Sequence, residues 1–278
     1  MSMGLALRPE VFKPLETLKI AENIFSEYFF IPDVSKDIDP IQLSFSILLK
    51  NKETLAGPGV IRVNEMQLNE LIRQIKTINE LVENRFFLGV GLGSVKEDVS
   101  QAIFSMREKI LKIKEETGIK IIVATLREGL AKRVKDISDG IILNFSTFDH
   151  ARKVSSVFKN ENRKVISYFK IFIAQTQDAA IHMAVSELQK YAAFPQYYEL
   201  FKKEGVIEDL LALYSKREEA ISNLQAKGVI AINPSPDFIK NVSDVFYKNG
   251  IDVLALYPYF SSTYTFDKRF AFLKEVFS

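Results

Sequence analysis

Eight short apolar runs alternate with helix-period stretches along this chain, and this alternation limits the fold more than any other feature. The runs are rich in β-branched and aromatic residues and cover 3–7, 28–31, 54–60, 86–90, 120–124, 140–143, 165–174 and 251–257. Strand followed by helix, repeated, implies parallel strands joined by helical crossovers. Eight such units predict a (β/α)₈ TIM barrel, which typically needs roughly 250 residues.

The competing architecture is a doubly wound open sheet, which would usually divide a chain of this length into two domains. The chain has 278 residues, and no Pro/Gly/Ser-rich linker divides it. We therefore predict a single barrel domain over residues 1–278, an α/β fold.

One stretch, residues 175–250, is too long for the single helix that a barrel needs between its seventh and eighth strands. Its periodicity predicts several helices, over 177–190, 195–203, 206–224 and 236–249. We predict a helical excursion that covers part of the barrel mouth or forms a subunit contact. Its most aromatic part, AAFPQYYELF, is interpreted either as a local aromatic core or as a platform for a ligand.

Composition removes several classes of function. The net charge of +2 is spread over interspersed signs, which argues against a nucleic-acid partner. The chain has no cysteine and two histidines, so disulfides, thiolate catalysis and a multi-histidine metal site are not expected. It shows neither an apolar run of roughly 20 residues nor a signal peptide. We predict a cytoplasmic protein with a small-molecule substrate, no membrane partner and no bound metal.

The stretch RFFLGVGLGS, at the end of the fourth apolar run, carries Gly89, Gly91 and Gly93. A dinucleotide fingerprint would follow the first strand and would have a glycine where this chain has Ser94. In a barrel, by contrast, the loops after the strands form the active face. Bare backbone N–H groups here, together with a helix that we predict to begin near Val95, would suit a phosphate. The alternative is that the glycines merely let the chain turn tightly.

Taken in order, several segments resemble the luciferase-like monooxygenase superfamily. The segments are YFFIPDV (28–34), DPIQLSFSILLKNKETLAGPGVI (39–61), INELVENRFFLGVGLGS (78–94), IIVATLREGLAKRVKDISDGIILN (121–144) and NGIDVLALYPY (249–259). Within the superfamily the nearest likeness is to the methylene-tetrahydromethanopterin reductases, which use the deazaflavin coenzyme F-420. The resemblance implies an oxidoreductase that transfers hydride to or from a small or pterin-like substrate, with F-420 as cofactor (alternatively FMN), and a homodimer.

The same resemblance implies roles for particular residues, each of which lies at or just after a strand end. One group would form a bulge behind the flavin ring, often built on a non-prolyl cis peptide bond, with an ordinary cis bond before Pro58 as the alternative: Gly57, Pro58, Gly59 and Val60. A second would line the ribityl and phosphate path: Gly89, Gly91, Gly93 and Ser94. Ala124 and Thr125 would form a second phosphate-side loop. Arg127 is interpreted either as a phosphate partner or as a surface helix charge.

The chain departs from the related reductases at three positions that often handle protons. It has Ala6, Val34 and Ser94 where the family commonly has a glutamate, a histidine and an acidic residue. Asp33 is the remaining acid at a strand end and our candidate catalytic residue. It would donate a proton or orient a substrate, or else only form a hydrogen bond within its own loop. The departures support an alternative function, a non-catalytic luciferase-like barrel kept as a ligand-binding or assembly protein.

Two further residues and one further class complete the expectations. Arg8 ends the first strand and is expected either to meet an anion or to pair with Asp33 or Glu10. His150, at a helix start after the sixth strand, is expected to be exposed; the alternative is a residue that faces the mouth and titrates near neutral pH. A phosphate-binding isomerase or aldolase ranks last, because no lysine stands at the end of an apolar run to form a Schiff base.

Overall fold

The computed structural model describes residues 2–93, 98–158, 163–213 and 217–278 of the chain. Its strands pair only in parallel. They are β1 (Ser2–Ala6), β2 (Tyr28–Ile31), β3 (Leu55–Pro58), β4 (Ile61–Arg62), β5 (Phe87–Gly91), β6 (Lys120–Ala124), β7 (Gly140–Asn144), β8 (Lys164–Ile173), β9 (Ile230–Ile232) and β10 (Val253–Phe260). Each of the eight predicted strands is therefore confirmed.

The strands form a barrel because the two ends of the sheet meet. Their order runs β3-β2-β1-β10-β8-β7-β6-β5-β4, and a bridge between Ala56 and Phe86 joins β3 to the residue before β5. The predicted third strand, 54–60, covers β3 and the bulge that follows it, and β4, beyond that run, pairs with β5. The predicted TIM barrel is thus confirmed. Its third strand bends at the place where the two ends of the sheet meet.

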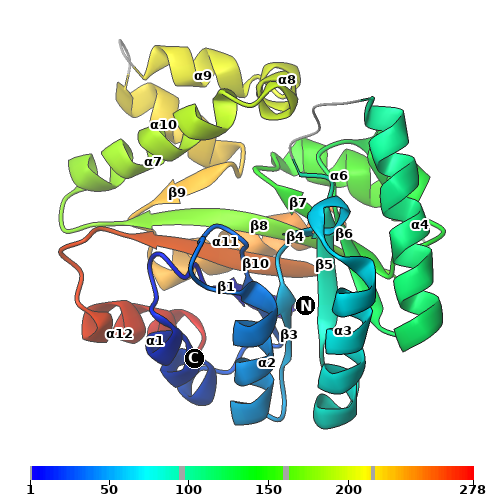
Figure 1. The fold of residues 1–278 in the computed structure, drawn as a ribbon. Coiled ribbons are helices and arrows are strands. Elements are labelled where there is room, and N and C mark those ends of the chain that lie inside the picture. Colours follow the sequence, from blue (N-terminus) through cyan, green and yellow to red (C-terminus); the bar gives the residue numbers. More distant parts are fainter. Residues whose placement is uncertain (1, 94–97, 159–162, 214–216) are drawn as a thin grey trace.

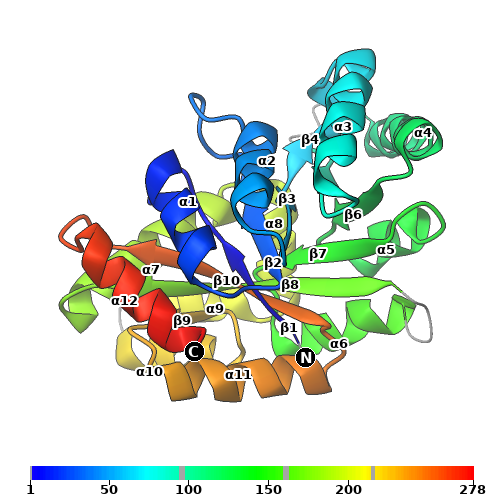
Figure 2. The ribbon, with the colours of Figure 1, turned by 90° about the horizontal axis from the view of Figure 1, so that it is seen from below.

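The crossover helices cover the outside of the barrel (Figures 1 and 2). They are α1 (Pro14–Asn23), α2 (Pro40–Lys50), α3 (Leu68–Val82), α4 (Val99–Thr117), α5 (Glu128–Val134), α6 (Phe148–Ser155), α11 (Pro236–Lys248) and the C-terminal α12 (Phe266–Val276). In both views α12 lies beside α1.

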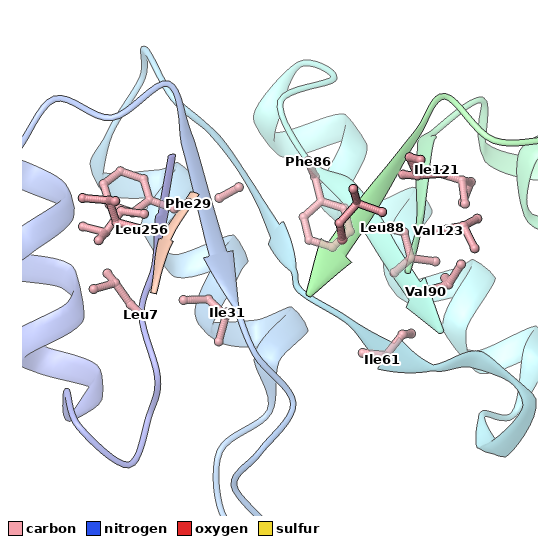
Figure 3. Packing of buried hydrophobic residues seen from close by; sticks show 14 of the residues in the cluster. Leu7, Phe29, Ile31, Ile61, Phe86, Leu88, Val90, Ile121, Val123 and Leu256 are labelled. Carbon is pink, nitrogen blue, oxygen red and sulfur yellow. The ribbon is translucent and has the colours of Figure 1, made fainter. Parts of the chain in front are cut away.

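An apolar layer holds these helices against the strands. On α3 the buried residues Leu71, Ile75, Ile78 and Val82 follow the 3.6-residue period read from the sequence. Figure 3 shows strand side chains of the same layer, one group around Phe29 and Leu256, another around Val90, Ile121 and Val123. Each fully buried side chain of this kind contributes about 1.5–3 kcal/mol.

The excursion gathers on one side of the barrel, at the top of Figure 1. It contains α7 (Gln177–Ala192), α8 (Pro195–Lys203), α9 (Val206–Ala212) and α10 (Arg217–Ala226), followed by β9 and α11. The predicted helix over 206–224 is wrong as a single element, since the described residues form two helices there. The strand β9 was also missed; it pairs with the carboxyl half of β8.

Within the residues that the structure describes, no helix is both long enough and apolar enough to cross a membrane.

Candidate active site

The carboxyl ends of the strands form the barrel mouth, and one side of it carries almost no side-chain volume. We call Gly59, Gly89, Gly91 and Ala124 the small-residue wall; they come from the bulge after β3, from β5 and from β6. A fourth glycine, Gly57, lies two residues before Gly59, deeper in the barrel. The sequence placed all of these at strand ends, and the structure brings them together along neighbouring strands.

Two of the glycines are required by close approach of the backbone. A Cβ atom added to Gly57 would lie 2.1 Å from the carbonyl oxygen of Phe87. One added to Gly89 would lie 2.1 Å from the carbonyl oxygen of Pro58. These glycines let β3 and β5 close the barrel, so the tight-packing interpretation accounts for them without any ligand.

Gly91 is different, because a Cβ there would meet only two described side chains within 4 Å. The nearest atoms are Val60 Cγ2 at 3.0 Å and Ala124 Cβ at 3.6 Å. Both Val60 and Ala124 are half-buried rather than enclosed. Together the three residues form a small apolar floor that reaches the surface of the mouth.

The bulge between β3 and β4 contains a cis peptide bond between Gly59 and Val60. The segment was expected to hold such a non-prolyl bond, and the structure confirms it. The Gly59 amide donates to the carbonyl of Ile31 at 2.8 Å. From across the barrel, the Tyr168 hydroxyl donates to the Gly59 carbonyl at 3.0 Å. A Cβ at Gly59 would lie 2.0 Å from that hydroxyl oxygen, so the Tyr168 side chain covers the inner face of the bulge.

The opposite side of the mouth is filled with large side chains. We call Tyr168, Lys170, Tyr257 and Tyr259, from β8 and β10, together with Arg8 after β1, the aromatic wall. These strand residues all face the interior, because alternate residues of a strand share one face. Lys170 is paired in register with Tyr257, and Phe172 with Tyr259.

Lys170 is fully buried inside this wall, with 0 % of its surface exposed. Its Nζ lies 3.9 Å from the ring centre of Tyr257, 4.5 Å from that of Phe145, 5.1 Å from that of Tyr191 and 5.5 Å from that of Tyr259. Among the described residues it makes one hydrogen bond, 3.3 Å long, to the Tyr259 hydroxyl. Burial lowers the pKa of Lys170 to about 7, against an opposing effect of Glu187.

A buried carboxylate links Lys170 to the helix above it. Glu187 of α7 accepts a hydrogen bond from the Tyr259 hydroxyl and lies 3.8 Å from Arg8 Nη1. Arg8 also pairs with Glu10, which was one of its expected partners. Its guanidinium carbon lies 4.4 Å from the ring centre of Tyr259.

Sequence reasoning missed Lys170 because the search looked only at the ends of the apolar runs. The residue is the single charge inside the run VISYFKIFIA. It also has the same strand parity as Tyr168 and Phe172, which is the signal that could have found it.

Asp33 is not part of the buried cluster. Its carboxylate pairs with Arg62 at 3.4 Å, and Arg62 is half exposed at the rim. The side chain of Arg62 also reaches Gly93, where an added Cβ would lie 2.9 Å from Arg62 Cγ. Arg62 belongs to β4, so the observed partner of Asp33 lies outside the loop in which a hydrogen bond was expected.

The residues that were expected near a cofactor phosphate have different outcomes. Ser94 lies outside the described residues, and α4 begins at Val99 with Asp98 as its N-cap, so the predicted start near Val95 is wrong. The Thr125 hydroxyl donates to the Arg127 carbonyl at 2.9 Å and is used within its own turn.

Arg127 is exposed and lines a cavity of about 540 Å³ between the loop after β6, α6 and α8. His150 lines the same cavity but is buried, with 4 % exposure, which corrects the expected exposed position. Its Nε2 lies 3.0 Å from the Leu126 carbonyl oxygen, and burial lowers the pKa of His150. The Thr147 side chain caps the start of α6 by accepting a hydrogen bond from the His150 backbone amide.

The aromatic part of the excursion forms a local core that closes over Lys170. The Phe145 ring meets Tyr191, Tyr197 and Phe201 at centroid distances of 4.7, 6.2 and 5.5 Å. The Tyr197 hydroxyl accepts a 2.7 Å hydrogen bond from Asn144 at the end of β7. Of the two interpretations offered for this stretch, the local core is the one observed.

Solved structures share this architecture over almost the whole chain. The F420-dependent tetrahydromethanopterin reductase from Methanopyrus kandleri has a TM-score of 0.73 at 15 % identity, covering 99 % of this chain and 96 % of the other. An F420-dependent secondary alcohol dehydrogenase, in complex with an F420–acetone adduct, also has a TM-score of 0.73, at 10 % identity and coverages of 99 % and 97 %.

An FMN complex belongs to the same group. The oxygenating constituent of 3,6-diketocamphane monooxygenase from Pseudomonas putida has a TM-score of 0.66 at 14 % identity, with coverages of 100 % and 97 %. The chain shares the fold of these structures. No family model matches the sequence, and no curated protein matches it. The luciferase-like neighbours include flavin- and F420-dependent oxidoreductases and monooxygenases, at identities that establish the fold of this chain.

Proposed function

We propose that this chain is an oxidoreductase that binds a flavin-type cofactor across the barrel mouth. The observation that carries the proposal is the apolar floor of Val60, Gly91 and Ala124 beside the cis bulge. A planar ring system needs a flat, side-chain-poor surface of this kind, and the floor reaches the outside of the mouth. F420 is favoured over FMN because the two F420-dependent neighbours overlay better than the FMN complex does.

The chemistry would come from the cofactor, which supplies hydride transfer when bound. This chain's residues would position it: Val60 would support the ring, and Gly91 would leave room at its edge. A small or pterin-like substrate would approach from the solvent side of the ring. Asp33, held by Arg62, would orient a polar group of that substrate rather than serve as a buried acid.

Titration of the purified protein with F420 and with FMN, followed by fluorescence and absorbance, tests the proposal. We expect saturable binding of one of them by the wild-type protein. The variant Gly91→Leu should weaken that binding at least tenfold, because its side chain would fill the floor beside Val60 and Ala124. The matched control is Gly129→Ala in α5, where an added Cβ meets no described atom within 4 Å.

Two results would contradict the proposal: no binding of either cofactor, or equal binding by wild type and Gly91→Leu. Hydride transfer is tested separately with reduced cofactor and pterin substrates, and Asp33→Asn should raise KM more than it lowers kcat.

A second candidate function is favoured by one specific observation, the Tyr168 hydroxyl bound to the Gly59 carbonyl. This contact fills the inner face of the bulge with the protein's own side chain. A non-catalytic barrel, kept for binding or assembly, would account for it and for the three absent proton-handling residues. Failure of both cofactors in the titration would support this candidate.

A further inference from the structure

The luciferase-like fold and the proposed cofactor do not account for Lys170, a buried amine one side-chain layer beneath the mouth. We propose that the Lys170 amine is a reactive site that forms an imine with a small aldehyde or ketone. The proposal does not depend on cofactor binding, because it concerns the aromatic wall rather than the small-residue wall.

The geometry around Nζ leaves the amine poorly satisfied. An ammonium group has three donors, yet among the described residues Lys170 makes only the 3.3 Å hydrogen bond to Tyr259. The remaining neighbours are ring faces, of which Tyr257 at 3.9 Å is the nearest. Ring faces stabilise the cation but form no conventional hydrogen bond to it, so two of its three donors have no conventional acceptor among the described residues.

The charged and titratable groups that face Lys170 come from three elements. They are Glu187 and Tyr191 from α7, Tyr257 and Tyr259 from β10, and Arg8 after β1. Burial lowers the pKa of Lys170 to about 7, Glu187 opposes this and Arg8 adds to it. A sizeable fraction of the amine is therefore neutral near pH 7, and the neutral amine is the nucleophile.

The chemistry balances without an oxidant or a reductant. The amine nitrogen attacks the carbonyl carbon, a C–N bond forms, and the carbonyl oxygen takes up a proton to give a carbinolamine. Loss of that hydroxyl as water breaks the C–O bond and leaves the imine. Tyr259, bonded both to Lys170 and to Glu187, is positioned to pass the protons that these two steps require.

Two buried polar atoms at the mouth, one a donor and the other an acceptor, could meet polar groups of such a ligand. Arg8 Nε and Asn144 Oδ1 are buried without a hydrogen-bond partner among the described residues. Arg8 stacks on Tyr259, one of the rings that also face Lys170. A small carbonyl compound that also carries a polar or anionic group fits this surrounding better than a purely apolar one.

Access to the amine runs past Tyr191. This ring lies 5.1 Å from Lys170 Nζ, and Tyr191 is partly exposed. A compound of two or three carbon atoms is the size that rotation of this ring would admit.

Reductive trapping tests the proposal directly. The full chain is treated with acetaldehyde and sodium cyanoborohydride from pH 5 to pH 10, and the modified lysines are mapped by peptide mass spectrometry. We expect an ethyl group on Lys170, with half-maximal labelling near pH 7. The control position is Lys164, the exposed first residue of the same strand, which should label slowly at pH 7. Lys170→Arg should abolish this label, whereas Lys164→Arg should leave it intact.

The variant Tyr191→Ala separates slow access from an unreactive amine. Faster labelling of Lys170 in this variant, with the half-point still near pH 7, supports the proposal. An unlabelled Lys170 in both proteins, while Lys164 is modified, would overturn it, and so would a half-point near the ordinary lysine pKa of about 10.4. The cofactor titration tests the small-residue wall instead. The cofactor proposal and the Lys170 proposal can therefore fail independently of each other.

Discussion

The two walls of the barrel mouth are built on opposite principles. The small-residue wall is thin because backbones approach each other there, and Gly57 and Gly89 allow β3 and β5 to close the barrel. The aromatic wall is thick because β8 and β10 direct tyrosines and a lysine into the interior. Glycine at a strand end therefore has two different roles in this molecule. Gly89 allows the sheet to close, and Gly91 leaves an open surface.

The contrast also separates the kinds of chemistry that each side can support. The small-residue wall has no buried titratable side chain and can offer only shape and backbone groups. The aromatic wall contains a buried amine, a carboxylate and phenols in contact. A mechanism that needs proton transfer within the barrel would have to draw on the aromatic wall.

The largest effect is expected where the backbone has no freedom to move. Gly89→Ala would put a methyl group 2.1 Å from the Pro58 carbonyl oxygen, and we expect it to lower the free energy of unfolding by about 3 kcal/mol. Chemical denaturation measures this loss. Gly129→Ala should instead gain about 0.5–1 kcal/mol, since it lies in the open part of a helix. Equal stability of the two variants would mean that closure of the barrel does not require glycine at position 89.

The next effect concerns the buried amine and depends on pH. The folded-state pKa of Lys170, about 7, lies below its unfolded value, so the unfolded chain binds more protons between pH 7 and pH 10. Stability conferred by this site therefore rises with pH across that window and is lowest below pH 7. Lys170→Met removes the titration, so its stability relative to wild type should be highest at pH 6.

That advantage should shrink by a few kcal/mol, roughly, between pH 6 and pH 9. Urea denaturation at several pH values measures the difference. Lys164→Met, at the exposed end of β8, should show no such trend. A pH-independent difference between Lys170→Met and wild type would rule out a depressed pKa at Lys170.

The smallest effect tests a hydrogen bond that joins the two walls. Tyr168→Phe removes the hydroxyl that donates to the Gly59 carbonyl, and we expect a loss of about 1 kcal/mol in unfolding free energy. Tyr198→Phe, which alters an exposed ring, serves as the control and should change stability by less than about 0.5 kcal/mol. Indistinguishable values for the two variants would show that the contact between the walls is not a stabilising one.

Much of the fold was readable from the sequence, because barrel strands and helices leave periodic signals. The face of α3 and the end of α4 at Gly118 follow directly from residue spacing and from glycine in the left-handed region. The short strand β9 left no such signal: IAI lies within a long helical stretch, and only pairing with β8 makes it a strand.

The candidate site was readable in part. The bulge at Gly59 and Val60 was anticipated together with its cis bond. What remained hidden were contacts between residues distant in sequence, such as Tyr168 with Gly59 and Glu187 with Tyr259. The inward position of His150 likewise depends on the Leu126 carbonyl, which local sequence does not reveal.

The strand β9 has one more consequence. It hydrogen-bonds along β8 opposite Lys170, Ile171 and Phe172, while β10 pairs with the other edge of the same three residues. The backbone that carries the buried amine is thus clamped between the end of the chain and the inserted segment. Deleting the inserted segment would therefore remove β9, which pairs with β8. Residues 170–172, including the buried lysine, would then lie on an unpaired strand edge.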